Sequence, residues 1–338
     1  MELSFVTSPF KLSRHLSRTI YGRHRKCRKY CVVVASCRKR RQENVAGNIY
    51  VDTSCIDCDT CRWLAPNIFS RKDGQSYVHK QPESTQEEEA AFKALVSCPT
   101  GSIRLERPCK LVKQTQDSFP YPVHADLPNI FYMGFASAKS FGAHSYLWLS
   151  SADSPTFSFP NSILVDSPRF FTPLAKNVQN RIAPGNCVDW MFLTHRDDVA
   201  DHEKWSSYLK ARRIIHYADA VGSLQSVEWI LEGDGPWYLS EDLKLVHVPG
   251  HTRGSTVLID KRNGVAFTGD HLAFDMEIGE LCAFPEVCWY SWKEQRSSVE
   301  KLMDEPFEWI LPGHGRPFHF HNEKERKELL GRIAKGGV

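Results

Sequence analysis

The sequence predicts two folded parts of mixed α and β structure, a small α+β part near the N-terminus and a larger α/β part after it. Four of the seven cysteines before residue 100 are spaced for one metal centre, and from Phe131 onward short β-type runs alternate with helical stretches. A chain of 338 residues is long enough for one small and one ordinary domain. A polar, Pro-containing segment between the two parts predicts a linker at 107–130.

The first part is organised by Cys55, Cys58 and Cys61 in the stretch CIDCDTC, and by Cys98, which precedes a proline. Three thiolates in one short loop can occupy three corners of a cube-shaped cluster, and a remote fourth can close it. The pattern resembles the single-cluster bacterial-type ferredoxins at all four cysteines. The resemblance implies a [4Fe–4S] cluster on these residues and a closing strand at 102–105. Zinc is the alternative that C-x2-C spacing leaves open.

Local patterns around the cysteines support a small domain at 46–106. Residues from Asn48 alternate like a short strand that enters the cysteine loop. Ser84 and Glu87 form a capping-box pattern ahead of EEEAAFKALV, which predicts a helix that packs Phe92 and its apolar neighbours inward.

The second part, 131–335, contains eight runs with the apolar content of β-strands, separated in several places by helical stretches. These runs are FYMGF, HSYLWLS, SILVDS, VDWMFLTH, ARRIIHY, LKLVHVPG, STVLID and GVAFTGD.

Three short motifs in this part place a potential metal ligand directly after a strand. His251 lies in VPGHTRGS, Asp270 in FTGDHL and His314 in LPGHGRP, and the neighbouring glycines permit a sharp turn. Together with ILVDSP and LTH upstream, these motifs resemble the metallo-β-lactamase superfamily over roughly 131–320. The resemblance implies an αββα sandwich that holds one or two divalent ions, zinc or iron, at one edge. It also implies catalytic roles for His251 and Asp270 and a supporting structural role for Asp166.

The stretch LTHRDDVADH departs from the ligand pattern H-x-H-x-D-H of that superfamily. His195 fits its first position, but Asp197 stands at the second histidine, and the pair Asp201–His202 falls two residues late. One register anchors the loop at His195. The other anchors it at Asp201–His202 and bulges the loop so that Asp197 or Asp198 turns inward. Candidate metal ligands are therefore His195, Asp197, Asp198, Asp201, His202, His251, Asp270 and His314, although Asp201 and His202 could instead begin a helix.

Three functions fit these residues, of which we predict the first, a metal-dependent hydrolase, and keep the other two as alternatives. The first is hydrolysis of a small-molecule ester or thioester by metal-activated water. The second is a non-haem iron oxidoreductase fed by the cluster, because a carboxylate at position 197 makes the site harder and better suited to iron or manganese. Flavodiiron proteins share such a carboxylate, and persulfide dioxygenases use two His and one Asp. The third is an electron-transfer protein with a degenerate metal site. A redox partner at the ferredoxin-like part is expected under the last two.

Residues 1–41 contain twelve Lys or Arg and a single acidic residue, Glu2, whereas the net charge of the whole chain is only +3. A basic, Ser-containing, acid-poor leader is typical of an organelle transit peptide. We expect a disordered chloroplast transit peptide, with the mitochondrion as the alternative destination. A nucleic-acid-binding arm is disfavoured because the rest of the chain is acidic. The apolar runs are too short for a membrane span.

Overall fold

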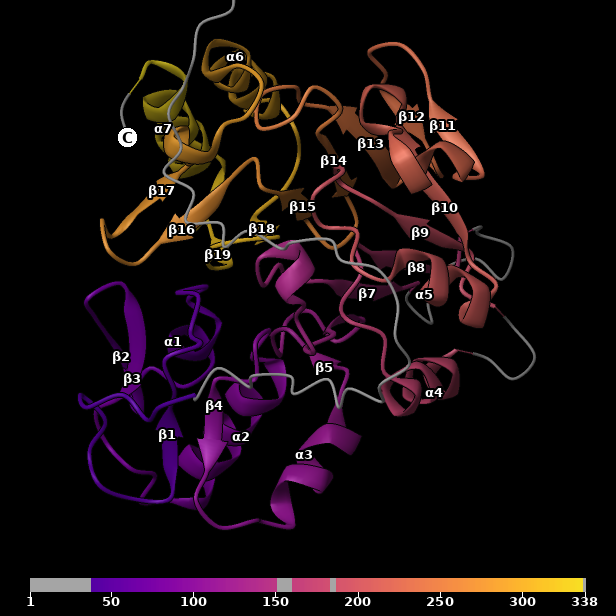
Figure 1. Cartoon of the computed structure of the whole chain (residues 1–338). Helices are drawn as coiled ribbons and strands as arrows, with labels where there is room; N and C mark the ends of the chain where they lie inside the picture. The colour runs from indigo at the N-terminus through magenta and orange to yellow at the C-terminus, as the bar shows by residue number, and fades with distance from the viewer. Residues whose placement is uncertain (1–37, 151–159, 183–186, 337–338) are drawn as a thin grey trace, which may run out of the picture. The chain divides into compact units, whose positions relative to one another are not determined.

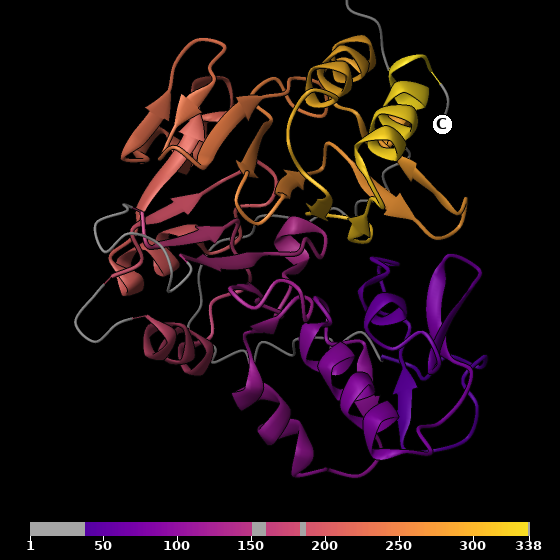
Figure 2. The same ribbon diagram turned by 180° about the vertical axis from the view of Figure 1, so that it is seen from behind.

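The apolar runs of the second part form two β-sheets whose inner faces share one hydrophobic core. We describe residues 38–150, 160–182 and 187–336 of a computed structural model (Figures 1 and 2). The first sheet has the order β11-β10-β9-β8-β7-β6-β5. Its strands are β5 (Tyr121–Pro122), β6 (Ile130–Tyr132), β7 (Tyr146–Leu149), β8 (Ser162–Val165), β9 (Trp190–Phe192), β10 (Arg212–His216) and β11 (Trp229–Leu231). Pairing is antiparallel from β5 to β8 and parallel from β8 to β11.

The second sheet has the order β12-β13-β14-β15-β18-β19. Its strands are β12 (Trp237–Tyr238), β13 (Leu243–His247), β14 (Thr256–Asp260), β15 (Val265–Gly269), β18 (Trp309–Pro312) and β19 (Phe318–His319). Only the β15–β18 pair is parallel. Leu245, Leu258 and Phe267 of this sheet lie in the same buried cluster as Leu147 and Ile163 of the first sheet.

Helices cover the outer faces of both sheets (Figure 1). On the first sheet, α4 (Thr172–Arg181) and α5 (His202–Leu209) bury Leu174 and Trp205 in the shared core. On the second, α6 (Trp292–Leu302) and α7 (Glu323–Ala334) form a separate buried cluster with β13, β14, β15 and β18. This αββα arrangement confirms the predicted fold, and all eight predicted runs contain a strand. The hairpin of β16 (Ala273–Asp275) and β17 (Glu280–Cys282) was not predicted.

The N-terminal part is a small α+β domain with its own core. Strands β1 (Ile49–Val51) and β4 (Ile103–Leu105) pair antiparallel, as do β2 (Phe69–Lys72) and β3 (Gln75–Val78). The short α1 (Thr60–Leu64) follows the cysteine loop, and α2 (Thr85–Ser97) precedes Cys98. The predicted cap of α2 is present, because the Ser84 hydroxyl accepts from the Glu87 amide at 3.2 Å.

The structure differs from two of the predicted boundaries. The expected linker 107–130 holds α3 (Leu111–Ser118), which contacts α2 and α4, and also the edge strand β5. The leader was expected to extend to residue 41, but Arg41 is buried and its guanidinium donates to the carbonyls of Lys72 and Ser76. A long, basic side chain is thus used to tie three segments together. Residues 1–37 of the expected transit peptide lie outside the described residues.

The residues Arg38–Val338 cluster as one compact unit, which includes both the cysteine domain and the two-sheet domain. Phe119 and Val96 belong to the same buried cluster as the strands of the first sheet, so the two domains share apolar packing. Among the described helices, none combines the length and the hydrophobicity that crossing a bilayer requires.

Candidate metal centres

The four predicted cluster cysteines line one small cavity between the 52–60 loop and the start of β4. None of the four is in a disulfide, and Cys61 and Cys98 are buried. Asp57 and Asp59, which alternate with the cysteines, adopt left-handed backbone angles, each with φ 61°. These turns wind the loop tightly enough for successive cysteine side chains to face the same cavity.

Backbone amides point at the sulfurs in this cavity. The Ser76 amide donates to Cys55 Sγ at 3.4 Å, and the Ser102 amide donates to Cys98 Sγ at 3.2 Å. Burial raises the pKa of Cys58 to about 11 and that of Cys61 well above its usual range. Thiols in such surroundings resist ionisation unless a metal binds them, while N–H···S bonds favour the bound thiolate. The donor set therefore fits an iron–sulfur cluster.

The second candidate centre lies at the ends of β9, β13, β15 and β18, where loops from both sheets meet. Its first position is formed by His195, His251 and Asp270, whose ligand atoms lie within 4.8 Å of one another. Nε2 of His195 is 3.6 Å and Nε2 of His251 is 3.5 Å from Asp270 Oδ2. Asp197 joins this group, because its Oδ2 is 3.6 Å from His251 Nε2.

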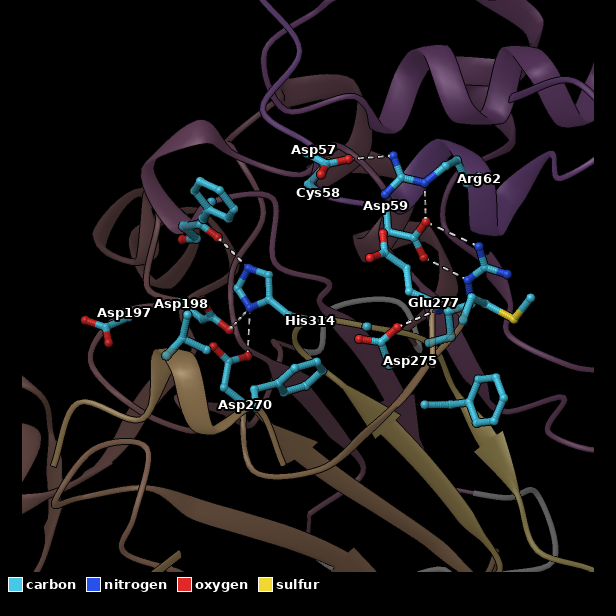
Figure 3. A pocket seen from close by; sticks show the side chains of 18 of the residues that line it. Asp57, Cys58, Asp59, Arg62, Asp197, Asp198, Asp270, Asp275, Glu277 and His314 are labelled. Carbon is cyan, nitrogen blue, oxygen red and sulfur yellow. Dashed lines mark hydrogen bonds and ion pairs between the residues drawn. The ribbon is translucent and has the colours of Figure 1, made fainter. Parts of the chain in front are cut away.

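The second position is formed by Asp198, Asp270 and His314 (Figure 3). His314 Nδ1 is 2.7 Å from Asp270 Oδ1 and 3.9 Å from Asp198 Oδ2. Gly313 leaves room for these carboxylates, since a Cβ there would lie 2.5 Å from Asp198 Oδ2 and 2.8 Å from Asp270 Oδ1. Asp270 thus presents one oxygen to each position and is the residue that could bridge two ions.

Several ligand atoms at these positions are buried without a hydrogen-bond partner among the described residues. They are Nε2 of His195, both ring nitrogens of His251, and both carboxylate oxygens of Asp198. An unpaired buried polar group costs about 1–3 kcal/mol, more when charged. Such a concentration of unpaired donors and acceptors is unusual unless an ion satisfies them, so the residues present fit a metal site.

The pKa shifts of the acidic and histidine side chains at the site also fit a metal site. Burial, followed by the charge of Asp270, raises the pKa of Asp198 well above its usual range. Burial would also raise the pKa of Asp270, but His314 and the two other histidines hold it below its usual value. Burial would lower the pKa of His314, yet Asp270 and Asp198 raise it to about 10. Carboxylates and histidines buried this close together shift one another's pKa strongly, as is common at functional sites.

A layer of polar residues orients the ligands. The Thr194 hydroxyl lies 3.0 Å from His195 Nδ1 and bonds to Asp166, which also accepts the Thr194 amide at 2.8 Å. Asp166 therefore holds the metal loop through Thr194, the supporting position proposed for it from the sequence. Asp219 does the same for the His251 loop, because it accepts the Thr252 hydroxyl at 2.5 Å and the Gly254 amide at 3.1 Å.

Asp201 and His202 were candidate ligands, and the structure places both outside the cluster. Asp201 precedes α5 in a left-handed conformation, and its carboxylate bonds to the Phe170 amide, Lys139 and Lys204. His202 begins α5 and is buried rather than solvent-facing, with ring contacts to Arg213 at 3.2 Å and Ser223 at 3.3 Å. The structure therefore combines parts of the two predicted registers: His195 faces the metal position, Asp197 and Asp198 turn inward, and the pair Asp201–His202 begins α5 instead of binding metal.

Both metal positions open onto a cavity of about 1210 Å³ that also reaches the cysteine domain. Of the four cluster cysteines, only Cys58 is among the described residues that line it. Exposed apolar side chains form part of its wall: Phe141, Met276, Val287 and Trp289. Phe141 lies 6.4 Å from the His314 ring, and Trp289 lies 6.2 Å from the His251 ring. This volume admits a small-molecule substrate beside either position.

Sequence reasoning missed the residues that join the two centres. His144, Ser140, Asp59 and Arg316 are not among the site residues that the sequence predicts. Arg316 and Asp59 form a two-point ion pair, with Nε to Oδ2 at 2.8 Å and Nη2 to Oδ1 at 3.2 Å. Their only signal in the sequence is adjacency, since Asp59 follows Cys58 and Arg316 lies two residues after His314.

Comparison with known proteins agrees with this division of the chain. Residues 51–105 match the sequence model of the 4Fe-4S single cluster domain of Ferredoxin I, and residues 195–314 match that of the metallo-beta-lactamase superfamily. The chain therefore contains a single-cluster ferredoxin domain and a metallo-β-lactamase domain. No curated protein matched the chain.

Solved structures that resemble the chain include ETHE1 from Myxococcus xanthus, which is 16% identical with a TM-score of 0.42 over 60% of this chain and 84% of that one. A metallo-beta-lactamase from Hirschia baltica is 14% identical with a TM-score of 0.45 over 61% and 93% of the two chains. A metallo-beta-lactamase family protein from Thermus thermophilus is 14% identical with a TM-score of 0.43 over 62% and 80%.

Proposed function

We propose that this chain, with its single-cluster ferredoxin domain and its metallo-β-lactamase domain, is a metal-dependent oxidoreductase. In this proposal the carboxylate-rich site would hold iron or a similar metal, and the cluster would supply or accept electrons next to it. The observation that carries it is the placement of three carboxylates, Asp197, Asp198 and Asp270, in one cavity with the cluster cysteine Cys58.

The donor set supports iron over zinc. Each position combines histidine with at least two carboxylate groups, and Asp197 stands where the related pattern has an imidazole. Hard anionic oxygen ligands suit iron and manganese better than zinc, and their negative charge favours the higher oxidation state. When bound, iron at these positions would supply one-electron redox chemistry, and the cluster would supply or accept the electrons.

The chain's own residues hold and orient this centre. His195 and His251 face Asp270 from one side, and His314 faces it from the other. The Ser140 carbonyl accepts a hydrogen bond from His314 Nε2 at 3.2 Å, so that Nδ1 is the nitrogen left to face the metal position. Asp197, with 44% of its side chain exposed, lies on the open side of the first position, where substrate from the cavity would approach.

Hydrolysis of an ester or thioester is the second candidate, because residues 195–314 match a superfamily whose fold supports metal-activated water. It would use the same ligands and substrate cavity. In that case the cluster would not carry electrons for the reaction and would have a structural or redox-sensing role beside the cavity.

Metal content and electron uptake test the proposal together. Protein purified without oxygen should contain iron beyond that of the cluster, and reductive titration should consume one electron for the cluster and one for each ferric ion. The Asp270→Asn variant should retain only the cluster's electron. Asp197→His should shift the bound metal from iron toward zinc, because it exchanges a carboxylate for an imidazole. Zinc in the wild-type protein, with electron uptake by the cluster alone, would overturn the redox proposal and favour hydrolysis.

We also propose that the protein acts in the chloroplast, supported by the basic leader. A fluorescent protein fused after residues 1–37 should enter plastids, and import into mitochondria would contradict this.

A further inference from the structure

A short segment of the cysteine loop, Cys58–Thr60, meets the metallo-β-lactamase domain through three contacts that all lead to His314. Each contact involves a different residue of the segment and a different chemical interaction. Their convergence on one metal position is the basis of the inference below.

The first contact is packing at Gly142. This residue has φ +96°, and a Cβ added to it would lie 2.8 Å from Cys58 Cβ, 3.2 Å from Cys58 Sγ and 3.2 Å from Pro99 Cγ. Only glycine allows the backbone to come this close to a cluster ligand. Two residues earlier, the Ser140 carbonyl bonds to His314, and the Ser140 hydroxyl accepts the amide of Ala200 in the metal loop at 3.2 Å.

The second contact is a chain of hydrogen bonds through His144. Cys58 Sγ lies 3.5 Å from the Thr60 hydroxyl, which lies 3.4 Å from His144 Nε2. The His144 amide donates to the Gly313 carbonyl at 2.7 Å, directly before His314. The His144 ring is buried and lies against Trp63, with ring centroids 4.8 Å apart. Its position therefore responds to the cysteine domain on one side and sets the Gly313 backbone on the other.

The third contact is the two-point ion pair of Asp59 and Arg316 described above. Bidentate arginine–carboxylate pairs fix relative orientation as well as distance. Because the pair is also joined to Arg62, whose Nε lies 2.6 Å from Asp59, movement of the cysteine loop would shift the segment after His314 (Figure 3).

We infer that Gly142 and His144 are positioning residues that couple the two centres, so that assembly of the cluster raises the metal affinity of the Asp198–Asp270–His314 position. The cluster would fix the position of Cys58, and the 137–144 loop packs against Cys58 through Gly142. That loop would hold His314 in the orientation that binds metal. Coupling of this kind is reciprocal: metal at this position should raise the affinity of the protein for the cluster by the same factor. The inference deepens the proposed function, because it assumes that both centres are used.

Zinc is the probe, because it binds without changing oxidation state and so keeps the test independent of redox chemistry. Zinc affinity should be measured by chelator competition on full-length, cluster-loaded protein, and the binding event that the Asp198→Asn variant loses is assigned to the second position. Removing the cluster should weaken this event by about 5- to 150-fold, the usual range of coupling between sites. Zinc should slow bleaching of the cluster by a chelator of iron.

Two variants in cluster-loaded protein test the contacts without requiring cluster removal. Thr60→Val keeps the side chain's shape but loses its bond to His144, and Gly142→Ala forces Cys58 and the loop apart. Both should weaken zinc at the second position and leave the first unchanged. The matched control is Gly101→Ala: Gly101 also has positive φ, +61°, and its amide bonds to the Cys98 carbonyl, but an added Cβ meets nothing within 4 Å.

If Thr60→Val and Gly142→Ala bind zinc at the second position as tightly as Gly101→Ala, the inference is wrong. That outcome would leave the proposed oxidoreductase function standing, because electron uptake is a separate measurement. Conversely, coupling of zinc to the cluster in a protein that never binds iron beyond the cluster would support the inference and contradict the proposed function.

Discussion

The cysteine loop at 55–61 and the metal loop at 195–202 are both short segments crowded with metal ligands, yet their residues are used differently. All three cysteines of the first face one cavity. In the metal loop, only His195, Asp197 and Asp198 face the metal positions. Asp201 and His202 instead bond to Phe170 and Arg213.

The difference lies in what each side chain can do besides binding metal. A buried thiol is a weak hydrogen-bonding group, so three cysteines in one loop have few structural uses that compete with a cluster. Aspartate and histidine also cap helices, pair with cations and accept backbone amides. Spacing is therefore a strong guide to function in the cysteine loop and a weak one in the metal loop.

The largest effect is expected from Cys58→Ser. Each thiolate supplies one corner of the cluster, so this variant should lose or convert the cluster and bleach its visible absorption. Cys187→Ser is the control, because Cys187 is exposed and does not line the cluster cavity. If Cys58→Ser kept its full absorbance and all four irons, spacing would be as weak a guide to the ligands in the cysteine loop as it is in the metal loop.

Asp270→Asn should abolish metal binding at both positions, since its two oxygens serve one position each. Metal per chain, corrected for cluster iron, measures this loss.

His202→Ala should keep the metal but lower the free energy of unfolding by about 1–3 kcal/mol, because the buried Arg213 loses an acceptor. If His202→Ala stripped metal as completely as Asp270→Asn, the division of the metal loop would be refuted.

Asp166→Ala should weaken metal binding roughly 10- to 100-fold, the usual effect of removing a residue that orients a ligand. Burial raises the pKa of Asp166 to about 8, although the Thr194 amide and hydroxyl that donate to it act in the opposite direction. Asp166→Asn keeps an acceptor for the Thr194 amide and should lose less affinity than Asp166→Ala. The metal affinity of both variants can be measured by chelator competition. If Asp166 bound the metal directly, Asp166→Asn and Asp166→Ala would lose the same affinity; if it acts through hydrogen bonds to Thr194, Asp166→Asn loses less.

The smallest effect is expected from Asp201→Asn, which should cost about 1 kcal/mol of stability and no metal. Burial alone would raise the pKa of Asp201, but the Phe170 amide and then Lys139 and Lys204 lower it to about 2. A carboxyl group whose pKa is lowered on folding stabilises the fold at pH values above 3.8, its ordinary pKa. This contribution is lost as the pH falls toward 2. Urea unfolding at several pH values should therefore show the two proteins converging below pH 3.8, and a difference that grows on acidification would contradict this.

The sequence alone determined the elements that depend on local pattern. The four cysteines, the cap of α2 and eight strands of the two sheets follow from spacing and periodicity, because ligand spacing, capping residues and apolar alternation can all be read within one segment. His251, Asp270 and His314 were identified because each lies in a glycine-containing turn directly after a strand. These features require no knowledge of how distant segments pack.

Only the tertiary structure decided the register of LTHRDDVADH and the relation between the two centres. Asp197 and Asp201 are the same residue type four positions apart. One meets His251 and the other Lys139 and the Phe170 amide, partners that come from distant segments. Likewise, Gly142, His144 and Arg316 have ordinary sequence surroundings, and their positions beside the cysteine loop arise from packing between domains. A polar side chain takes the partner that the fold brings to it, and local sequence does not encode that partner.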